Sequence, residues 1–354
     1  DESRSEYLEN YVLKDKYYII YKMRPEVVFL NPLILLFLLY KLRFFNWKRL
    51  KYNFFGTLLD YYRYVIFSII SPEVVITFND NSGAIGRLVN NYRKATFIAI
   101  QNGKRNSLLF NKNIKLKHDH YFCFGENDIN FFKENGFSAK HYHPVGSFRA
   151  GISMEIFDEL TKKNIYDICL VSIWRPWINQ NLPNYKSSFQ DIWDTFNHTN
   201  TMMNKFIQSN NLKICVAMRS EHHHDREKQY WQSFFGDRAV LIPNDIINLS
   251  SFKAVQQSNL VIGVASTLVL ESFGMGKKVL YCDFTDSNKY VDYDSSIVFR
   301  KKNYNEFSNR LEKLIKEPND RYISRNDKYA KYLMNLDIKN PPHIIIRKLI
   351  EGSL

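Results

Sequence analysis

The sequence has little cysteine. Four cysteines occur among 354 residues, none of them in a CxxC pair, and each lies in an apolar, strand-like run: Cys123, Cys169, Cys215 and Cys282. This number is too small for a disulfide framework in a chain of this length. We therefore expect buried free thiols and a cytoplasmic protein. The sequence begins at Asp1 rather than Met, and we expect it to be a trimmed chain or one domain of a longer protein.

The sequence also lacks an apolar run long enough to span a bilayer. The best candidate, residues 27–40, is shorter than the roughly 20 residues that a spanning helix needs, and it contains Asn31 and Pro32. A basic, aromatic stretch follows from Lys41 to Phe55. The plainer interpretation is a buried helix with a solvated basic neighbour. The alternative is a peripheral anchor on the inner face of the cell membrane, where Lys and Arg meet anionic headgroups.

Acidic side chains are outnumbered by basic ones. Lys and Arg total 49 against 36 Asp and Glu, which gives a formal net charge of +13. Such a surplus favours a polyanionic partner, namely nucleic acid, an acidic membrane surface or a phosphorylated substrate. The sequence has no zinc-finger spacing and no Gly-aromatic strand typical of RNA-binding domains, and its charge is spread along the chain. A basic nucleic-acid-binding protein is therefore the less favoured class, and we expect no nucleic-acid partner.

From residue 71 onward, β-branched runs alternate with helical segments. Strands are predicted at 72–78, 95–103, 120–125, 141–149, 165–174, 212–219, 238–243, 259–267 and 277–284. Such alternation is typical of α/β domains with doubly wound parallel sheets. We predict two Rossmann-like domains, at 71–155 and 156–320. A helical segment (1–70) precedes them and C-terminal helices (321–354) follow them.

The segment VIGVASTLVLE at 261–271 is the strongest candidate site. Ligands of open α/β sheets bind at the carboxyl ends of strands, and here a buried strand leads into a helix at Ser266 and Thr267. The free N–H groups and the dipole of a helix N-terminus favour a phosphate. Glu271 lies one turn further on and is placed to accept hydrogen bonds from ribose hydroxyls. The alternative is an ordinary Ser/Thr N-cap, with Glu271 part of the capping arrangement.

Four motifs together resemble a known family. The segment Ser266–Phe284 resembles the nucleotide-binding segment of GT-B glycosyltransferases that build bacterial capsule and lipopolysaccharide. AIQNGKR at 99–105 is similar to the "QHG" turn of Kdo transferases, capsule polysialyltransferases and CDP-glycerol glycerophosphotransferases. PVGSFRAG at 144–151 resembles the turn that ends their first domain, and VAMRSEHH at 216–223 lies where several of them contact the nucleotide. The resemblance covers about residues 70–320 and implies a GT-B fold, with a cleft between an acceptor domain and a nucleotide-sugar-binding domain.

Two departures from the family pattern limit the resemblance. Asn102 stands where the second motif usually has His, so a histidine base is absent from that turn. Arg219-Ser220-Glu221 replaces a His-Pro pair, which leaves the identity of the nucleotide open. The first change argues against a glycerophosphotransferase.

Inverting glycosyl transfer needs a base near the acceptor hydroxyl and positive charge near the departing phosphate. Asp80 follows the first predicted strand and is our candidate base, with an Asx-turn as the alternative; Glu126 is the reserve, although it also fits a helix N-terminus. Arginines suit the phosphate because their guanidinium forks bind it bidentately. The remaining candidates are Arg219, Glu221, His222, Arg175 and Trp174 on the donor side, and Gln101, Asn102, Gly103, Arg105, Ser147 and Arg149 on the acceptor side.

The histidines also suggest a metal site. His222–His224 form a run, and the pairs His118/His120 and His141/His143 alternate, so that each pair on a strand would face one side. The sequence has no HExxH motif and no Cys/His spacing of a structural zinc site. The resemblance likewise implies metal-independent chemistry. We therefore expect no metal and no cofactor besides the nucleotide-sugar co-substrate.

The sequence thus predicts an inverting glycosyltransferase that moves a sugar from a nucleotide donor to a bacterial surface glycan or lipid-linked acceptor. Among donors, the resemblance slightly favours a CMP-activated nonulosonic or Kdo-type sugar. Two alternatives use the same fold, a CDP-glycerol or ribitol-type phosphotransferase and a sugar-nucleotide 2-epimerase. An epimerase needs carboxylates around the sugar, and the sequence alone does not locate them.

Overall fold

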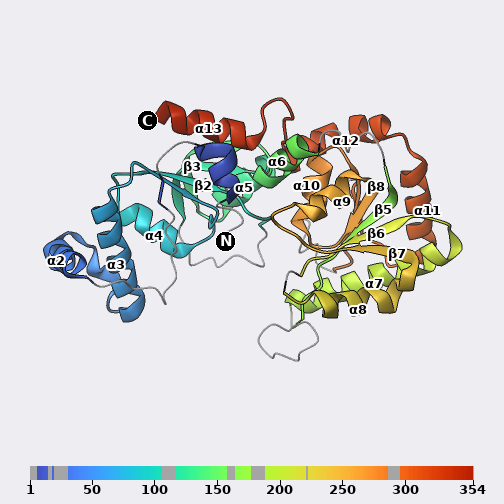
Figure 1. Cartoon of the computed structure of the whole chain (residues 1–354), viewed down its shortest axis with the longest axis horizontal. Coiled ribbons are helices and arrows are strands. Elements are labelled where there is room, and N and C mark those ends of the chain that lie inside the picture. The colour runs from blue at the N-terminus through green and yellow to red at the C-terminus, as the bar shows by residue number, and fades with distance from the viewer. Residues whose placement is uncertain are drawn as a thin grey trace.

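Two parallel α/β domains lie side by side in the computed structural model (Figure 1). The structure describes residues 6–14, 18–19, 31–105, 116–157, 164–176, 188–220, 222–285 and 296–353. Within these ranges, the strands predicted from residue 71 onward are present and pair in parallel. The prediction of two parallel α/β domains is therefore confirmed.

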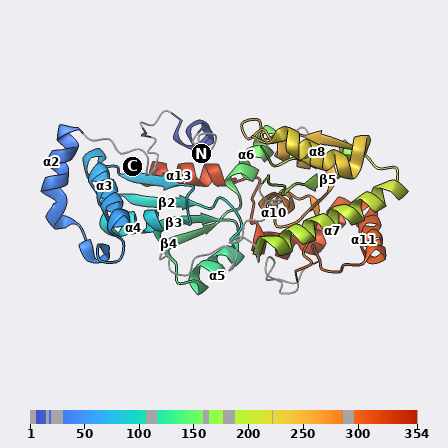
Figure 2. The same cartoon turned by 90° about the horizontal axis from the view of Figure 1, so that it is seen from below.

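The first domain is built on a sheet of strand order β1-β2-β3-β4. Its strands are β1 (Val74–Thr77), β2 (Thr96–Ile100), β3 (Lys117–Cys123) and β4 (Ser138–Pro144). The helices that precede, connect or follow them are α2 (Pro32–Lys41), α3 (Phe54–Ile70), α4 (Gly83–Asn91), α5 (Glu126–Glu134) and α6 (Phe148–Ile156), and short helical turns are η1 (Glu9–Leu13), η2 (Leu42–Phe44) and η3 (Trp47–Arg49). The carboxyl ends of these strands face the second domain (Figure 2).

The second domain is built on a sheet of strand order β10-β9-β8-β5-β6-β7. Its strands are β5 (Tyr166–Val171), β6 (Ile214–Ala217), β7 (Ala239–Ile242), β8 (Ser258–Gly263), β9 (Lys278–Cys282) and β10 (Val298–Phe299). Its helices are α7 (Ser188–Ser209), α8 (His224–Phe235), α9 (Ser250–Gln256), α10 (Thr267–Gly274), α11 (Tyr304–Lys316) and α12 (Asn319–Leu333), with the turn η6 (Gly236–Arg238).

Strand β5 is the point at which the order of the second sheet reverses. It pairs with β6 on one side and with β8 on the other. Both neighbours are parallel to it, so the loops after β5, β6 and β8 leave the same edge of the sheet. In open α/β sheets this switch point is where ligands bind. The strand is apolar along most of its length because both of its faces are covered. All four cysteines are buried and free, as predicted.

The C-terminal helices return the chain to the first domain. Helix α12 packs on α10 and also on α5, and α13 (Pro342–Ser353) packs on α6 and η1. Figure 1 shows α13 lying along the first domain. Between them, Asn335 donates from its backbone N–H to Phe124 O and from Nδ2 to Pro144 O, both at 2.7 Å. Gly146, at φ +87°, would bring a Cβ to 3.0 Å from Leu336, so the close approach of the two segments requires glycine.

The interpretation of residues 27–40 as a buried helix is wrong where the structure describes them. Residues 27–30 lie outside the described part, and α2 covers the rest. Helix α2 is apolar on all sides, but only one narrow face, with Ile34 buried, packs on α3. Leu36 and Leu39 are 65% and 69% exposed. Among the residues that the structure describes, no helix combines the length and the apolarity needed to cross a membrane.

Candidate functional site

The site predicted from the sequence gathers at the carboxyl edge of the second sheet. Arg175 follows β5, Arg219 follows β6, and Ser266 and Thr267 follow β8. These strands are direct neighbours at the switch point, so residues far apart in the sequence share one edge.

The N-terminus of α10 has no side-chain cap. Ser266 is the N-cap residue, with extended backbone angles, but its side chain makes no capping hydrogen bond. Ala265, just before it, has a left-handed backbone at φ 45°. The first N–H groups of a helix have no partner within the helix, so here they are left for a ligand or water. The alternative of an ordinary Ser/Thr cap, in which a side chain accepts from these groups, is therefore wrong.

The two predicted halves of the cleft meet at α10. Thr267 Oγ1 accepts a hydrogen bond of 3.0 Å from the backbone N–H of Lys104, in the QNGKR segment of the first domain. A Cβ on Gly103 would lie 3.5 Å from the same oxygen. The structure thus brings the Gln101–Arg105 segment against the proposed phosphate site, as the sequence led us to expect of a cleft between two domains.

Glu271 does not have the environment predicted for a ribose contact. Its side chain is buried, and Oε1 accepts a hydrogen bond from Ser147 Oγ at the N-terminus of α6. Arg149 lies 3.9 Å from the same carboxylate and over the ring of Phe252. Ser147 and Arg149, predicted to line the acceptor side, therefore join the two domains through Glu271 in this structure. Glu271 Oε2 is buried and has no hydrogen-bond partner among the described atoms.

Two arginines lie close together at the strand ends. Burial and, to a lesser extent, the nearby charge of Arg175 together lower the pKa of Arg219 to about 10, against the opposing effect of Glu227. Burial also lowers the pKa of Arg175. Both remain cationic at neutral pH. Arg219 is nonetheless an exposed residue, so a ligand can reach it from solvent. Like charges held together in this way favour an anionic ligand.

The loops that carry these arginines are held by a buried carboxylate that sequence analysis missed. Glu227, on α8, accepts from the backbone N–H groups of Arg219 and Ser220 at 3.0 and 2.7 Å, and from the hydroxyl of Ser172 after β5. Trp231 Nε1 is a further donor at 3.3 Å. Glu227 thereby fixes the ends of β5 and β6 relative to each other. Its spacing gave a signal, because Glu227, Trp231 and Phe235 recur every four residues on one buried helix face.

Asp80 is not placed as an accessible base. Its side chain is fully buried, and its carboxylate binds the guanidinium of Arg105 and accepts from Tyr121 OH at 3.3 Å. Burial raises the pKa of Asp80 against the opposing effect of Arg105. A carboxylate enclosed and paired in this way does not reach an acceptor hydroxyl. In this structure Asp80 and Arg105 are a structural ion pair, and the prediction of Asp80 as base is corrected accordingly.

Glu126, the reserve base, is exposed, whereas the nearby Asp128, which was not predicted, is buried and hydrogen-bonded. Glu126 is exposed at the first residue of α5, at the carboxyl edge of the first sheet. Asp128 is buried, and its Oδ1 accepts from Gln101 Nε2 at 3.0 Å and Lys104 Nζ at 3.1 Å. Gln101, predicted as an acceptor contact, is itself buried and shapes the loop from inside. No sequence feature marks Asp128 as a buried residue, apart from its position in the first turn of a helix.

The remaining predicted residues differ in their surroundings. Trp174 is packed in the hydrophobic core and only 5% exposed, so the prediction that it stacks on a sugar or base is wrong. Glu221 lies outside the described residues. His222 is exposed, whereas Asn102 is half-buried beside Gln101.

The predicted histidine pairs lie on neighbouring strands of the first domain. His120 Nδ1 is 3.0 Å from His143 Nε2, and burial lowers the pKa of His143 to about 4. His118 is buried, and its Nε2 lies 3.3 Å from the backbone oxygen of Asp80. No group of three or more His, Cys, Asp or Glu side chains in the described ranges is arranged to hold a metal ion.

Comparisons with known proteins agree with this architecture. A family described as "putative O-antigen biosynthesis protein" matches residues 98–349, more than half of the chain. No curated protein matches the sequence.

Among solved structures, the chain is similar to a "putative UDP-N-acetylglucosamine 2-epimerase" from Listeria monocytogenes, at 14% identity and TM-score 0.53, over 84% of this chain and 78% of that one. It is similar to UDP-GlcNAc 2-epimerase from Neisseria meningitidis bound to UDP-GlcNAc, at 11% identity and TM-score 0.51, over 84% and 80%. It also matches S. aureus MnaA with UDP, at 12% identity and TM-score 0.50, over 99% and 85%. These likenesses confirm the predicted GT-B fold.

Proposed function

Because the chain belongs to the family described as "putative O-antigen biosynthesis protein", we propose that it is a glycosyltransferase of bacterial surface-carbohydrate synthesis. It moves a sugar from a nucleotide donor, bound by the second domain, to a growing glycan or lipid-linked acceptor, bound by the first. No metal takes part. The departing phosphate is stabilised by the open N-terminus of α10 together with Arg175 and Arg219, which supply fixed dipoles and positive charge where negative charge develops.

The contact between Lys104 and Thr267 is the observation that carries this proposal. It brings the loop after β2 of the first domain within hydrogen-bond distance of the proposed phosphate site in the second. A transferase needs its acceptor and its donor phosphate at such a boundary, because the reacting groups must be oriented within about 3–3.5 Å of each other. Lys104 also reaches Asp128, so the loop is held in position rather than extended into solvent.

We assign the base role to Glu126 ahead of Asp80. Glu126 is exposed at the carboxyl edge of the first sheet, whereas the carboxylate of Asp80 is enclosed and paired. A general base must come within hydrogen-bond reach of the acceptor hydroxyl. The Glu126→Gln variant should bind nucleotide normally and lose transfer, whereas normal turnover by this variant would refute the assignment.

The first experiment is a calorimetric binding panel of CMP, CDP, UMP, UDP and GDP in the absence of metal. Selective binding of CMP supports a CMP-activated nonulosonic or Kdo-type donor, and preference for UDP or GDP supports a sugar-diphosphate donor. The double variant Ser266→Ala/Thr267→Ala should lower the affinity for the preferred nucleotide about tenfold or more. Thr201→Ala on α7, far along the sequence from these loops, is the matched control. If none of the nucleotides binds, the proposed function is wrong.

A sugar-nucleotide 2-epimerase is the second candidate, and one observation favours it. Asp128 and Glu271 are buried carboxylates at the domain boundary, and each has one oxygen without a described hydrogen-bond partner. Such groups suit proton transfers on a bound sugar. Incubation with UDP-GlcNAc and no acceptor, followed by NMR, separates the two functions. Inversion at C2 without an acceptor identifies an epimerase, whereas an unchanged nucleotide sugar favours the transferase.

A CDP-glycerol or ribitol-type phosphotransferase remains the third candidate. Asn102 replaces the histidine usual in that family, which argues against a phosphotransferase. Preferential binding of CDP in the nucleotide panel would reverse that order.

A further inference from the structure

The N-terminal end of the first domain carries a large apolar surface that the rest of the described chain leaves uncovered. On α2, Leu36, Leu39 and Tyr40 are more than half exposed, as is Phe44 in the following turn η2; Phe55, at the start of α3, is 82% exposed. Single exposed apolar residues are common, but a contiguous exposed apolar surface marks a site of interaction. Both views show α2 at the end of the molecule, on the far side of α3 from the second domain (Figures 1 and 2).

This surface is held in a defined position. Asn31 caps α2, accepting from Ile34 N at 2.8 Å, and Pro32 occupies the first helical position, where its missing N–H costs nothing. Tyr61 on α3 donates its hydroxyl to Leu38 O, and Phe45 packs against Tyr61 with ring centroids 5.1 Å apart. The exposed residues of α2 therefore form a fixed face on a packed helix pair.

The charge around the apolar surface is of one sign. The sequence has no Asp or Glu between Glu26 and Asp60, whereas Lys and Arg occur at 41, 43, 48, 49 and 51. Asp60 is buried and fully engaged, because Arg49, Arg63 and Arg87 all bind its carboxylate. The solvent-facing charge of this end is therefore positive, which complements an anionic surface.

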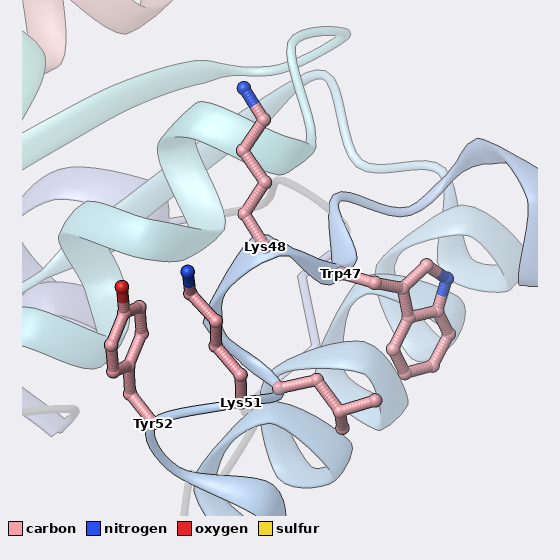
Figure 3. A pocket seen from close by; sticks show the side chains of 5 residues that line it. Trp47, Lys48, Lys51 and Tyr52 are labelled. Atoms are coloured by element: carbon pink, nitrogen blue, oxygen red, sulfur yellow. The ribbon is translucent and has the colours of Figure 1, made fainter.

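An open recess of about 720 Å³ adjoins the basic stretch. It is lined by Trp47, Lys48, Leu50, Lys51 and Tyr52. Figure 3 shows the amines of Lys48 and Lys51 and the hydroxyl of Tyr52 pointing to the same side, with the Trp47 ring directed away from them. Trp47 is anchored by its Nε1 hydrogen bond of 2.8 Å to Leu42 O. Two ammonium groups and a phenol on one side are donors that suit a phosphate group.

We propose that residues 31–58 are a docking surface for an anionic lipid bilayer. Helix α2 has ten residues and a length of about 15 Å, half of the roughly 30 Å hydrocarbon core, so it lies in the interface instead of spanning. Its leucines enter the acyl boundary, Tyr40, Phe44 and Phe55 lie at headgroup depth, and Lys48 and Lys51 bind lipid phosphates. Because the surface is remote from the second domain, docking leaves the donor site accessible.

The test is co-sedimentation of the full chain with vesicles of phosphatidylcholine, with and without phosphatidylglycerol. The chain should sediment with the anionic vesicles and be released by salt, since each Lys or Arg contributes through a screened attraction. Leu36→Glu/Leu39→Glu should reduce binding at least about tenfold, and Lys48→Glu/Lys51→Glu should abolish the preference for phosphatidylglycerol. Circular dichroism and thermal melting check that the variants are folded.

Matched controls exist elsewhere on the surface. Ile338 is 68% exposed, close to the 69% of Leu39, so Ile338→Glu makes the same kind of change outside the docking surface. Lys328→Glu/Lys339→Glu reverses two exposed charges on the C-terminal helices and their connection. Both controls should sediment like the unmodified chain.

The proposal is overturned if the chain binds neither kind of vesicle. It is also overturned if the chain binds and the Leu36→Glu/Leu39→Glu variant binds equally well. Concentration-dependent dimerisation that Leu39→Glu abolishes would instead assign the surface to a second copy of this chain. The inference does not depend on the transferase reaction. Nucleotide calorimetry on the same variants should be unaffected, so failure of docking and failure of the proposed function are distinguishable.

Discussion

The two sides of the domain boundary hold their charged groups in different ways. On the first-domain side, buried carboxylates are paired with cations: Asp80 with Arg105, and Asp128 with Lys104. On the second-domain side, burial lowers the pKa of Arg219, and the like charge of Arg175 lowers it as well, against the opposing effect of Glu227. The first arrangement is close to neutral because each buried carboxylate has a cation beside it, whereas the second keeps positive charge at the ends of strands. Burial of a charged residue is therefore a poor guide to the site, and the sign of its neighbours is a better one.

Removing the cation of a buried ion pair on the first-domain side should have the largest effect on the free energy of unfolding. Arg105→Met leaves the Asp80 carboxylate buried without its cation, and removing one partner of a buried pair costs about 3–5 kcal/mol. Chemical denaturation at pH 7 measures the loss. A loss within about 0.5 kcal/mol, as expected of an ordinary surface substitution, would contradict the pairing.

The same variant should show a diagnostic pH dependence. Burial raises the pKa of Asp80, and Arg105 opposes this, so the variant raises it further. A carboxyl whose folded-state pKa lies above its unfolded value binds a proton more tightly when folded, so stability rises as pH falls through the folded-state pKa. The deficit relative to the unmodified chain should therefore shrink on acidification. In Asp80→Asn/Arg105→Met the deficit should not depend on pH in this way.

Removing the Glu227 carboxylate, which holds the loops after β5 and β6 in the second domain, should have the next largest effect on stability. Glu227→Gln keeps the shape of the side chain but sets an amide donor against the N–H groups of Arg219 and Ser220. Leaving buried donors unsatisfied costs about 1–3 kcal/mol, and nucleotide affinity should fall with it because the Arg219 loop loses its support. Glu312→Gln, in an exposed helical pair with Lys316, is the control and should change neither quantity. Lost stability with full nucleotide affinity would restrict Glu227 to a structural role.

Removing the charge of Arg219 should separate binding from stability. Arg219→Met should weaken nucleotide binding about tenfold, the effect of one charge-assisted hydrogen bond, without lowering the melting temperature. The pKa of Arg219 is lowered in the folded protein, which means that folding disfavours its charge. Arg238→Met, an exposed arginine of the same domain, should change neither property. A clear drop in melting temperature for Arg219→Met would show that Arg219 serves the fold, as Arg105 does.

The sequence predicted the sheets well because parallel strands leave a strong local pattern. Runs such as residues 166–171 are apolar since both faces are covered, and the helices between them follow from periodicity. The position of Ser266 and Thr267 at a strand end followed from the same pattern. Strand order and the contact of Thr267 with Lys104 did not, because they depend on packing between segments 163 residues apart.

The environments of the charged residues were the part that local sequence could not provide. Asp80 and Glu227 are each flanked in the sequence by polar residues, and nothing in these flanking residues shows that the two carboxylates are buried. Trp174 was misjudged for the opposite reason, since an aromatic residue after a strand fits a ligand face or a core equally well. Helix α2 was misjudged because apolar character indicates burial only when the fold supplies a covering element.

The smallest expected effect concerns the boundary itself. Thr267→Val keeps the shape of the side chain but removes the acceptor of the Lys104 N–H, at a cost of about 1 kcal/mol. Thr201→Val removes a comparable hydroxyl bond inside α7 and is the matched control. If the Thr267 hydroxyl only joins the domains, Thr267→Val should lower stability slightly and leave nucleotide affinity unchanged. If it also binds phosphate, affinity should fall by more than the stability loss explains, and unchanged affinity would confine the phosphate site to Ser266, the backbone of α10 and the arginines.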